Sequence, residues 1–462
     1  MNRDMYHNTN TAQSQYMYFG PITTTDTTTN TIRNMYQQFP EFCLSVSQRL
    51  SNILDRVGYS QNNRDRKVRI ATETEIFRHI GDNFWESRCS VYLFGSRGEG
   101  STGPGLFSDI DYLHQNNESK IITNLSDCEA GKINLYMFQD GNTHPGYVKL
   151  LLIRILPDNT PAAFHVCAFD SFGVYVLKNT CFQSNYVGFC SGTADRQQQT
   201  YISCDRVPAL RCSQWPREGY EWFHRRRCYG WPTTRQIQNA WKYGCFATAV
   251  GHPSSNEEVL EWRLSFSLAE RDLVRSFGDI VMKVYILLKM VKKTFIEPFL
   301  EDAFSSYHCK VCMLWMREKT PSELWCTANL LCCLILCIRQ LYEWANAGFC
   351  PDYFIVKNNI YDRKIVGMAR TKLIQILERL LSDDCRFLCR IECCHIGRIL
   401  LDDLSSFEYY RLEVEFLVID DGIIDYKFTA WNATLCRNYM LMKISAELSW
   451  SDILSCKIRF CL

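Results

Sequence analysis

The chain has 462 residues, of which 47% are hydrophobic and 22% charged, and its formal net charge is +1. This is the composition of a globular protein long enough for two lobes, and it excludes a strongly basic nucleic-acid binder of the histone type. The longest apolar run, residues 328–338, is too short to cross a bilayer, and the first residues lack the apolar segment of a signal peptide. We therefore expect a cytoplasmic protein with no membrane partner.

Four regions follow one another along the chain. Residues 1–34 are rich in Thr and Asn, and such a polar stretch cannot bury enough surface to offset its ordering entropy, so we expect it to be disordered. Residues 35–232 are predicted to form a lobe of helices and a sheet, and residues 233–408 a helical lobe. Residues 409–462 mix strand-like and aromatic segments without a motif that indicates their role.

The spacing of apolar residues predicts the individual elements. In the first lobe it predicts helices at 42–57 and 68–84, and strands at 91–94, 108–113, 133–138, 148–156 and 201–210. In the second lobe it predicts helices at 236–243, 269–277, 280–294, 307–317, 322–345 and 365–381. The expected fold class is therefore α+β, with a mixed, twisted sheet in one lobe and helices in the other.

The segment between the first two predicted strands carries the densest chemical pattern. Gly95 and Ser96 follow the apolar strand 91–94, and a turn there can offer backbone N–H groups and a hydroxyl to a phosphate. A glycine-rich stretch then leads to Asp109 and Asp111, which share one face of a strand because side chains alternate. Carboxylates are hard oxygen ligands that suit Mg²⁺ or Mn²⁺. The pattern predicts one site for a triphosphate and a metal ion.

An isolated Asp-x-Asp strand can simply be solvated, but its combination with a Gly-Ser turn resembles the signature of the nucleotidyltransferase superfamily. In that superfamily a third catalytic acid comes from a later strand. Alternation along 201–210 places Ser203, Asp205 and Val207 on one face. Asp205 is therefore the candidate third acid, provided that the two strands are neighbours.

Several motifs in order resemble the Mab-twenty-one family, which includes cyclic GMP-AMP synthase and the animal cGAS-like receptors. The motifs are Asp205 followed by Val-Pro-Ala-Leu and Trp215-Pro216, the Trp262-Arg-Leu-Ser-Phe-Ser-Leu-Ala-Glu270 block, Ser305-Ser-Tyr-His-Cys-Lys310, and Pro351-Asp-Tyr-Phe354. The resemblance spans about residues 40–405. It implies a bilobed nucleotidyltransferase fold, with residues 35–232 as its core and residues 233–408 as the family's helical C-terminal lobe.

The resemblance also implies an activity and a set of site residues. The enzyme would join two nucleoside triphosphates, such as ATP and GTP, into a cyclic dinucleotide of innate immunity. Asp109, Asp111 and Asp205 would hold two Mg²⁺ or Mn²⁺ ions, and Gly95 and Ser96 would cradle the triphosphate. Arg263, Ser265, Ser267 and Glu270 would contact the acceptor nucleotide, Lys289 and Lys310 would reach phosphate, and Tyr307, with Ser306 beside it, would stack on a base.

Each assignment has a structural alternative. Ser265 or Ser267 could simply cap a helix start, and Tyr307 could be a core aromatic. Two residues depart from the family's pattern: Asp109 stands where Glu is common, and Phe94 where the synthase has Thr. The alternative function is a non-catalytic developmental or scaffold protein of the same fold, but the retention of three aspartates favours the enzyme.

Two basic clusters are candidates for a nucleic-acid surface, although charge runs are also common on solvated faces. The first comprises Arg49, Arg56, Arg64, Arg66, Lys67 and Arg69, and the second comprises Arg225, Arg226, Arg227 and Lys242. In cyclic GMP-AMP synthase a zinc-binding insertion follows the Ser-Phe-Ser motif, whereas here residues 271–277 continue directly into the next predicted helix. The resemblance therefore points to double-stranded RNA, with DNA as the alternative activator.

The 24 cysteines lie mostly in apolar stretches, where Cys serves as a small hydrophobe. The alternative is a zinc site, for which the candidates are Cys309, Cys312, Cys385, Cys389, Cys393, Cys394 and His395. Structural zinc sites usually combine two cysteine pairs from different segments. We therefore favour packing over metal binding for these residues.

Overall fold

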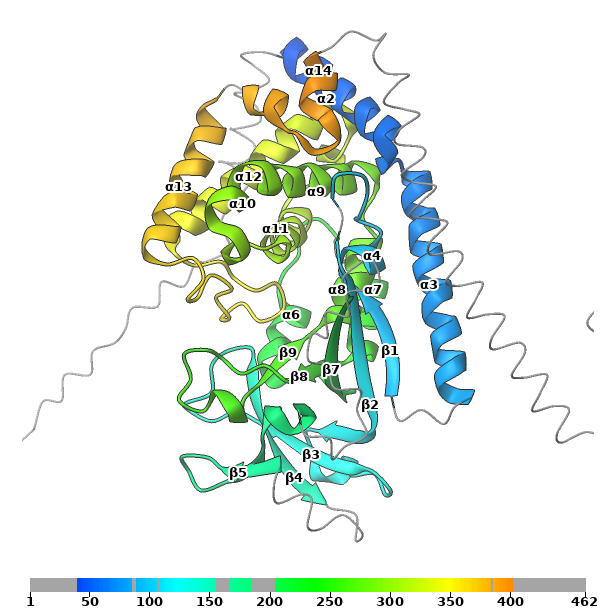
Figure 1. Cartoon of the computed structure of the whole chain (residues 1–462), viewed down its shortest axis with the longest axis vertical. Helices are drawn as coiled ribbons and strands as arrows, with labels where there is room; N and C mark the ends of the chain where they lie inside the picture. Colours follow the sequence, from blue (N-terminus) through cyan, green and yellow to red (C-terminus); the bar gives the residue numbers. More distant parts are fainter. Residues whose placement is uncertain are drawn as a thin grey trace, which may run out of the picture.

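The computed structural model describes residues 40–84, 89–106, 108–154, 166–183, 204–383 and 385–401. The predictions for residues 1–34 and 409–462 lie outside the described residues. Within them, a sheet with flanking helices forms one lobe and a cluster of helices forms the other (Figure 1). One large apolar core runs through both lobes, since it includes Leu150 of the sheet and Leu334 of the helical lobe. The α+β class and the bilobed architecture predicted from the sequence are confirmed.

The described strands form one mixed sheet. They are β1 (Cys89–Phe94), β2 (Ile110–Ile122), β3 (Ile133–Phe138), β4 (Tyr147–Arg154), β5 (Cys167–Phe169), β6 (Tyr175–Leu177), β7 (Cys204–Cys212), β8 (Cys245–Thr248) and β9 (Trp262–Ser265). Their order is β1-β2-β7-β8-β9-β4-β6-β5, and β3 pairs with both β2 and β4. β7 lies parallel to β2 and directly beside it, although a long stretch of chain separates the two strands.

The helices divide between the flank of the sheet and the helical lobe. They are α2 (Pro40–Leu54), which continues as a π-helical turn (Asp55–Tyr59), α3 (Gln61–Phe84), α4 (Gly95–Glu99), α6 (Tyr220–His224), α7 (Thr234–Tyr243), α8 (Ser267–Arg275), α9 (Asp279–Val291), α10 (Glu297–Leu300), α11 (Ser306–Lys319), α12 (Leu330–Ala347), α13 (Gly367–Ser382) and α14 (Ile396–Leu401). In Figure 1, α3 runs along the sheet lobe beside β1, and α9 to α13 gather at one end of the sheet.

The boundary predicted at residue 232 differs from the structure, because β8 and β9 follow it and belong to the sheet. Each of these strands has four residues, and all four residues of β8 are buried. β8 therefore lacks the alternation by which strands are recognised in a sequence, whereas β9 alternates between buried and less buried residues but over only four positions. β2 is also longer than predicted. Its polar stretch 115–118 has low strand propensity, and pairing with β1 and β7 stabilises it.

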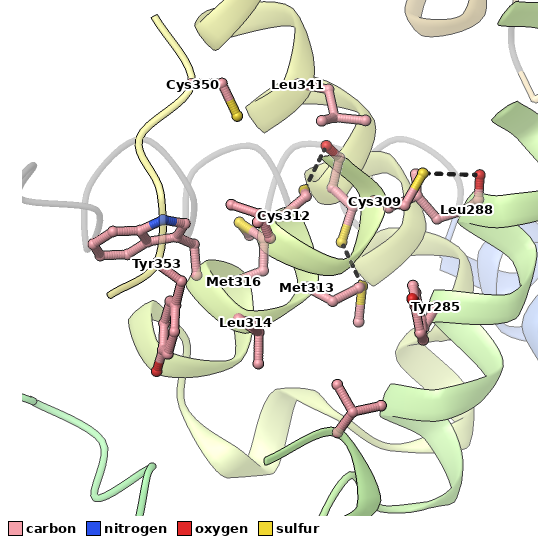
Figure 2. Packing of buried hydrophobic residues seen from close by; sticks show 14 of the residues in the cluster. Tyr285, Leu288, Cys309, Cys312, Met313, Leu314, Met316, Leu341, Cys350 and Tyr353 are labelled. Carbon is pink, nitrogen blue, oxygen red and sulfur yellow. Dashed lines mark hydrogen bonds between the residues drawn. The ribbon is translucent and has the colours of Figure 1, made fainter. Parts of the chain in front are cut away.

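Cysteines fill the interior of the helical lobe between α9, α11 and α12. Figure 2 shows Cys309 and Cys312 packed among apolar side chains such as Met313. Both cysteines are fully buried, and the Cys312 thiol donates to the Cys337 carbonyl at 3.5 Å. Burial raises the pKa of the Cys309 thiol to about 12. These residues therefore act as small core side chains, as the sequence predicted.

In the part of the chain that the structure describes, one helical stretch, Thr327–Ala347, is long and apolar enough to cross a membrane by length and composition. The stretch contains α12, and 72% of its apolar window is buried inside the protein. In this structure it is the central helix of the helical lobe.

Candidate active site

The pairing of β2 with β7 brings two of the predicted acids together. Asp111 lies in register with Asp205 on the parallel neighbouring strand, so the two side chains share one face of the sheet. Burial, together with the nearby charges of Asp205 and Asp109, raises the pKa of Asp111 to about 6, although the charge of Lys310 opposes the shift. Asp109 is exposed just before β2. The structure thus brings Asp111 and Asp205 together where β2 begins, and Asp109 directly precedes that strand.

The opposite face of β2 is apolar, as the alternation predicts. Tyr112 is buried in a small cluster with Ala71 of α3 and with Val91 and Leu93 of β1. Because α3 packs on that face and β1 is hydrogen-bonded to β2 beside it, rotation of the strand would expose the cluster. The position of Asp111 is therefore set by the packing behind it.

Gly95 lies directly against the Asp111 carboxylate. Its φ of +64° is in the left-handed region, and a Cβ added there would lie 1.7 Å from Oδ2 of Asp111. No other residue fits this position without displacing the carboxylate. Gly95 therefore packs directly against the strand that carries Asp111. The sequence suggested this proximity, and the structure shows the contact.

Lys289 holds the turn from the helical lobe. Its ammonium donates to the Ser96 hydroxyl at 2.8 Å and to the Ser101 carbonyl at 3.0 Å. The side chain is only 4% exposed, and burial lowers its pKa to about 8. In this structure Lys289 supports the turn, and its contact with phosphate stays a prediction.

The block from Arg263 to Glu270 spans the end of β9 and the start of α8. The Ser265 and Ser267 hydroxyls are hydrogen-bonded at 2.9 Å. Phe266 occupies the N-cap of α8, so neither serine takes the capping position that was their structural alternative. Arg263 is exposed, whereas Glu270 is buried. The exposed arginine and the serine pair are available for a ligand contact, which the structure does not test.

Tyr307 belongs to a polar network at the start of α11. Ser305 caps this helix in a capping box with His308, which leaves Ser306 as its first residue. The Tyr307 hydroxyl donates to Asp352 at 3.0 Å, and its oxygen lies 3.4 Å from Oε1 of Glu270. Burial raises the pKa of Asp352 to about 6, and the bond from Tyr307 opposes that shift. The hydrogen bond from its hydroxyl therefore fixes the position of Tyr307, independently of the contacts of its ring.

This contact yields a prediction for Tyr307→Phe. The loss of the hydroxyl leaves a buried Asp352 oxygen without its donor, so we expect the free energy of unfolding to fall by about 1–3 kcal/mol. The pKa of Asp352 should rise further above about 6. Urea unfolding measures the first effect, with Tyr220→Phe as the control because that ring is 41% exposed. Equal stability of Tyr307→Phe and wild type would show that the bond is weak.

Sequence reasoning missed two members of the network, Glu99 and Asp352. Glu99 ends α4 and is 2% exposed, and Asp352 is 6% exposed. Glu99 lies one turn after Gly95, and Asp352 follows Pro351 directly, so both lie within motifs that the sequence predicts to be functional. What identifies these two residues is the burial of a carboxylate beside a predicted ligand residue. Burial is visible only in the structure.

The donor chemistry suits a hard divalent cation, because Asp111 and Asp205 present oxygen ligands side by side and repel one another. Across the described residues, however, no group of three or more His, Cys, Asp or Glu side chains is placed so that it could hold a metal ion. This finding also covers the cysteines and His395 considered for zinc. The metal-ligand role of Asp109 therefore stays a prediction.

The two predicted basic clusters do not form continuous surfaces. Arg64 is buried and donates to the Val274 and Arg275 carbonyls at the end of α8. Arg225 donates to the Tyr353 carbonyl and to Glu318, and Arg227 is ion-paired with the same glutamate. The prediction is wrong for these three arginines, since their guanidinium groups hold elements together. Burial and partners of this kind are not visible in a charge run.

Two family models match this chain, and together they cover residues on β7, on β9 and in the helical lobe. A family model described as the Mab-21 protein nucleotidyltransferase domain matches residues 186–276, and one described as the Mab-21 protein HhH/H2TH-like domain matches residues 281–380. The first match includes Asp205 and the Arg263 to Glu270 block, and the second includes Lys289, Tyr307 and Lys310.

Two curated relatives match with modest identity. A cyclic GMP-AMP synthase-like receptor of Magallana gigas is 29% identical over 189 residues, which cover 39% of this chain and 31% of the relative. A cyclic GMP-AMP synthase of Sus scrofa is 24% identical over 185 residues, which cover 36% of this chain and 37% of the relative. The matched stretches thus span about a third of each relative's length. The chain carries a Mab-21 nucleotidyltransferase domain followed by a Mab-21 HhH/H2TH-like domain.

Proposed function

We propose that this protein is a metal-dependent nucleotidyltransferase that joins two nucleoside triphosphates, such as ATP and GTP, into a cyclic dinucleotide when double-stranded RNA binds. The observation that carries the proposal is the register of Asp111 with Asp205, with Gly95 packed against the first of them. The names of the two relatives support the choice of product class.

The proposed chemistry assigns a task to each group. Asp111, Asp205 and Asp109 would hold two Mg²⁺ or Mn²⁺ ions, which supply a lowered pKa for the attacking hydroxyl and charge neutralisation for the leaving pyrophosphate. Ser96, held by Lys289, would orient the triphosphate against these acids. Arg263 and the serine pair after it would position the acceptor nucleotide.

The decisive experiment incubates the purified chain with labelled ATP, GTP, CTP and UTP, Mn²⁺ and duplex RNA. We expect a cyclic dinucleotide from at least one pair of nucleotides, and the pair that reacts identifies the product. Absence of product from every pair, with nucleotides still bound, would favour the second candidate, a non-catalytic scaffold. The incomplete three-ligand group at Asp109 is the observation that favours this alternative.

The activator surface is best sought on α7. Arg235 and Lys242 are exposed seven residues apart and so lie on one side of the helix, the half-exposed Trp241 directly precedes Lys242 in sequence, and α7 contains no acidic residue. On α3, by contrast, exposed Arg66 and Arg69 are offset by exposed Asp65 and Glu73. Basic groups with an exposed aromatic ring suit a nucleic acid better than a face of balanced charge.

Charge reversal on α7 tests this assignment. Arg235→Glu combined with Lys242→Glu should weaken duplex RNA binding at least tenfold and reduce the slope of log affinity against log salt by about 2, because two phosphate contacts are lost. Binding measured by fluorescence anisotropy across a salt series gives both values. The matched control is Arg66→Glu combined with Arg69→Glu. A larger loss of RNA affinity in that control would show that the duplex binds at α3 instead.

A further inference from the structure

Lys310 lies between two buried carboxylates. Its Nζ is 2.5 Å from Oε1 of Glu99 and 3.2 Å from Oε2 of Glu270. The three side chains are 12%, 2% and 11% exposed, so water screens the charges weakly. The two carboxylates raise the pKa of Lys310 although burial acts against them. One ammonium is thus shared by two acids, and the Lys289 ammonium is a second positive charge that acts on Glu99.

Glu99 is the unusual member of this group. Its Oε2 is buried and has no hydrogen-bond partner among the residues that the structure describes, and burial raises the pKa of its carboxyl group. A buried carboxylate that is only half satisfied costs stability. Glu99 also ends the short helix α4 that begins at Gly95, so it belongs to the same turn as Ser96. Stability alone does not account for a glutamate in this place.

Lys310 lies within electrostatic reach of the candidate active site. Its positive charge lowers the pKa of Asp111, whereas the charge of Glu99 raises it. An ammonium has three donors, of which two are directed at Glu99 and Glu270. A triphosphate that enters beside Ser96 would therefore meet a lysine already neutralised by an acid from the same turn.

We propose that Glu99 is an internal anion that competes with the nucleotide triphosphate for the Lys310 ammonium and thereby sets the nucleotide affinity of the site. The inference rests on the proposed function, because it takes Lys310 as a phosphate ligand. Glu99 acts through Lys310 and is a positioning residue, not a catalytic one. Release of Lys310 from Glu99 would be part of nucleotide binding.

The test measures the affinity of the full chain for ATP and GTP analogues in which a methylene group replaces the α,β-bridging oxygen. Glu99→Gln keeps the size of the side chain and removes its charge, so we expect the Kd to fall roughly three- to tenfold. Glu99→Met, an apolar side chain of similar length, should act in the same direction and replaces Glu99→Gln if that variant does not fold. Glu318→Gln is the matched control, since Glu318 is a buried glutamate on α11 that pairs with Arg225.

A double-mutant cycle separates an effect through Lys310 from a general effect of charge. Lys310→Gln alone should weaken binding, and Glu99→Gln added to it should change the Kd less than twofold. Weaker binding by Glu99→Gln at an unchanged thermal midpoint, or equal tightening with and without Lys310, would overturn the inference and leave the proposed function standing. Failure of the wild-type chain to bind any analogue would overturn the proposed function as well.

Discussion

Asp205→Asn should lower nucleotide transfer roughly a hundred- to a thousandfold and leave the fold intact. The residue lies in register with Asp111, and loss of one charged group that stabilises the transition state typically costs this much. Asp205 is exposed and its charge raises the pKa of Asp111, so its removal relieves a repulsion. The thermal midpoint should therefore stay the same or rise, as is common when an active-site charge is neutralised.

Steady-state turnover and thermal unfolding of the same preparation check both halves of this prediction. Asp302→Asn serves as the control, because Asp302 is an exposed acid on a short turn of the helical lobe. Full activity of Asp205→Asn would mean that the third acid has been assigned wrongly. A large fall in the midpoint would mean that Asp205 supports the strand pairing.

Lys149→Met should destabilise the sheet lobe by about 3–5 kcal/mol. Lys149 on β4 is fully buried, and its ammonium is 2.6 Å from Asp140, 3.2 Å from Asp170 and 2.6 Å from Glu257. Removal of the lysine leaves three carboxylates, one of them fully buried, without their cation. Urea unfolding measures the loss, and Lys120→Met, which affects a surface pair with Glu129, should change the midpoint little.

The pH dependence of this cluster has a definite sign. Burial alone would raise the pKa of Asp170, but hydrogen bonds from the Val174 amide and from Lys149 bring it below the ordinary value. The pKa values of Asp140 and Glu257 are lowered in the same way. The stabilisation is therefore present above about pH 4, where carboxylates of the unfolded chain ionise, and is lost as pH falls below it. Lys149→Met should reduce the loss of unfolding free energy at acid pH. A dependence of stability on pH equal to that of the wild type would contradict the prediction.

Much of the first lobe could be predicted because its elements follow strong local rules. The alternation around Ile110 and Asp111 places Asp111 on β2 correctly, and the apolar run before Gly95 correctly predicts β1, whereas Asp109 lies just before β2 and Gly95 begins α4. The core cysteines follow from their apolar neighbours, as at Cys309 and Cys312. The short strands β8 and β9 were not predicted, because the four residues of β8 are all buried and show no alternation, and the alternation of β9 covers only four residues.

The nucleic-acid role predicted for Arg64, Arg225 and Arg227 was wrong for a different reason. A run of arginines specifies charge, but burial and partners decide its role, and these come from segments far away in the chain. Arg64 reaches the end of α8, and Arg225 stacks over Trp315 and reaches Tyr353. Only Arg226 of the triplet is exposed. Side-chain direction within such a run depends on the tertiary contacts of each residue.

The sequence by itself determined which residues are candidates for the chemistry: a Gly-Ser turn, an Asp-x-Asp segment, a later strand aspartate and an ordered set of motifs. Local side-chain alternation and turn chemistry are properties of neighbouring residues, so they can be read from the chain. The tertiary structure alone decided that β7 pairs with β2, which places Asp205 beside Asp111. It also decided that Lys289 and Lys310 are held by Ser96 and Glu99, because strand pairing and burial depend on contacts between residues distant in sequence.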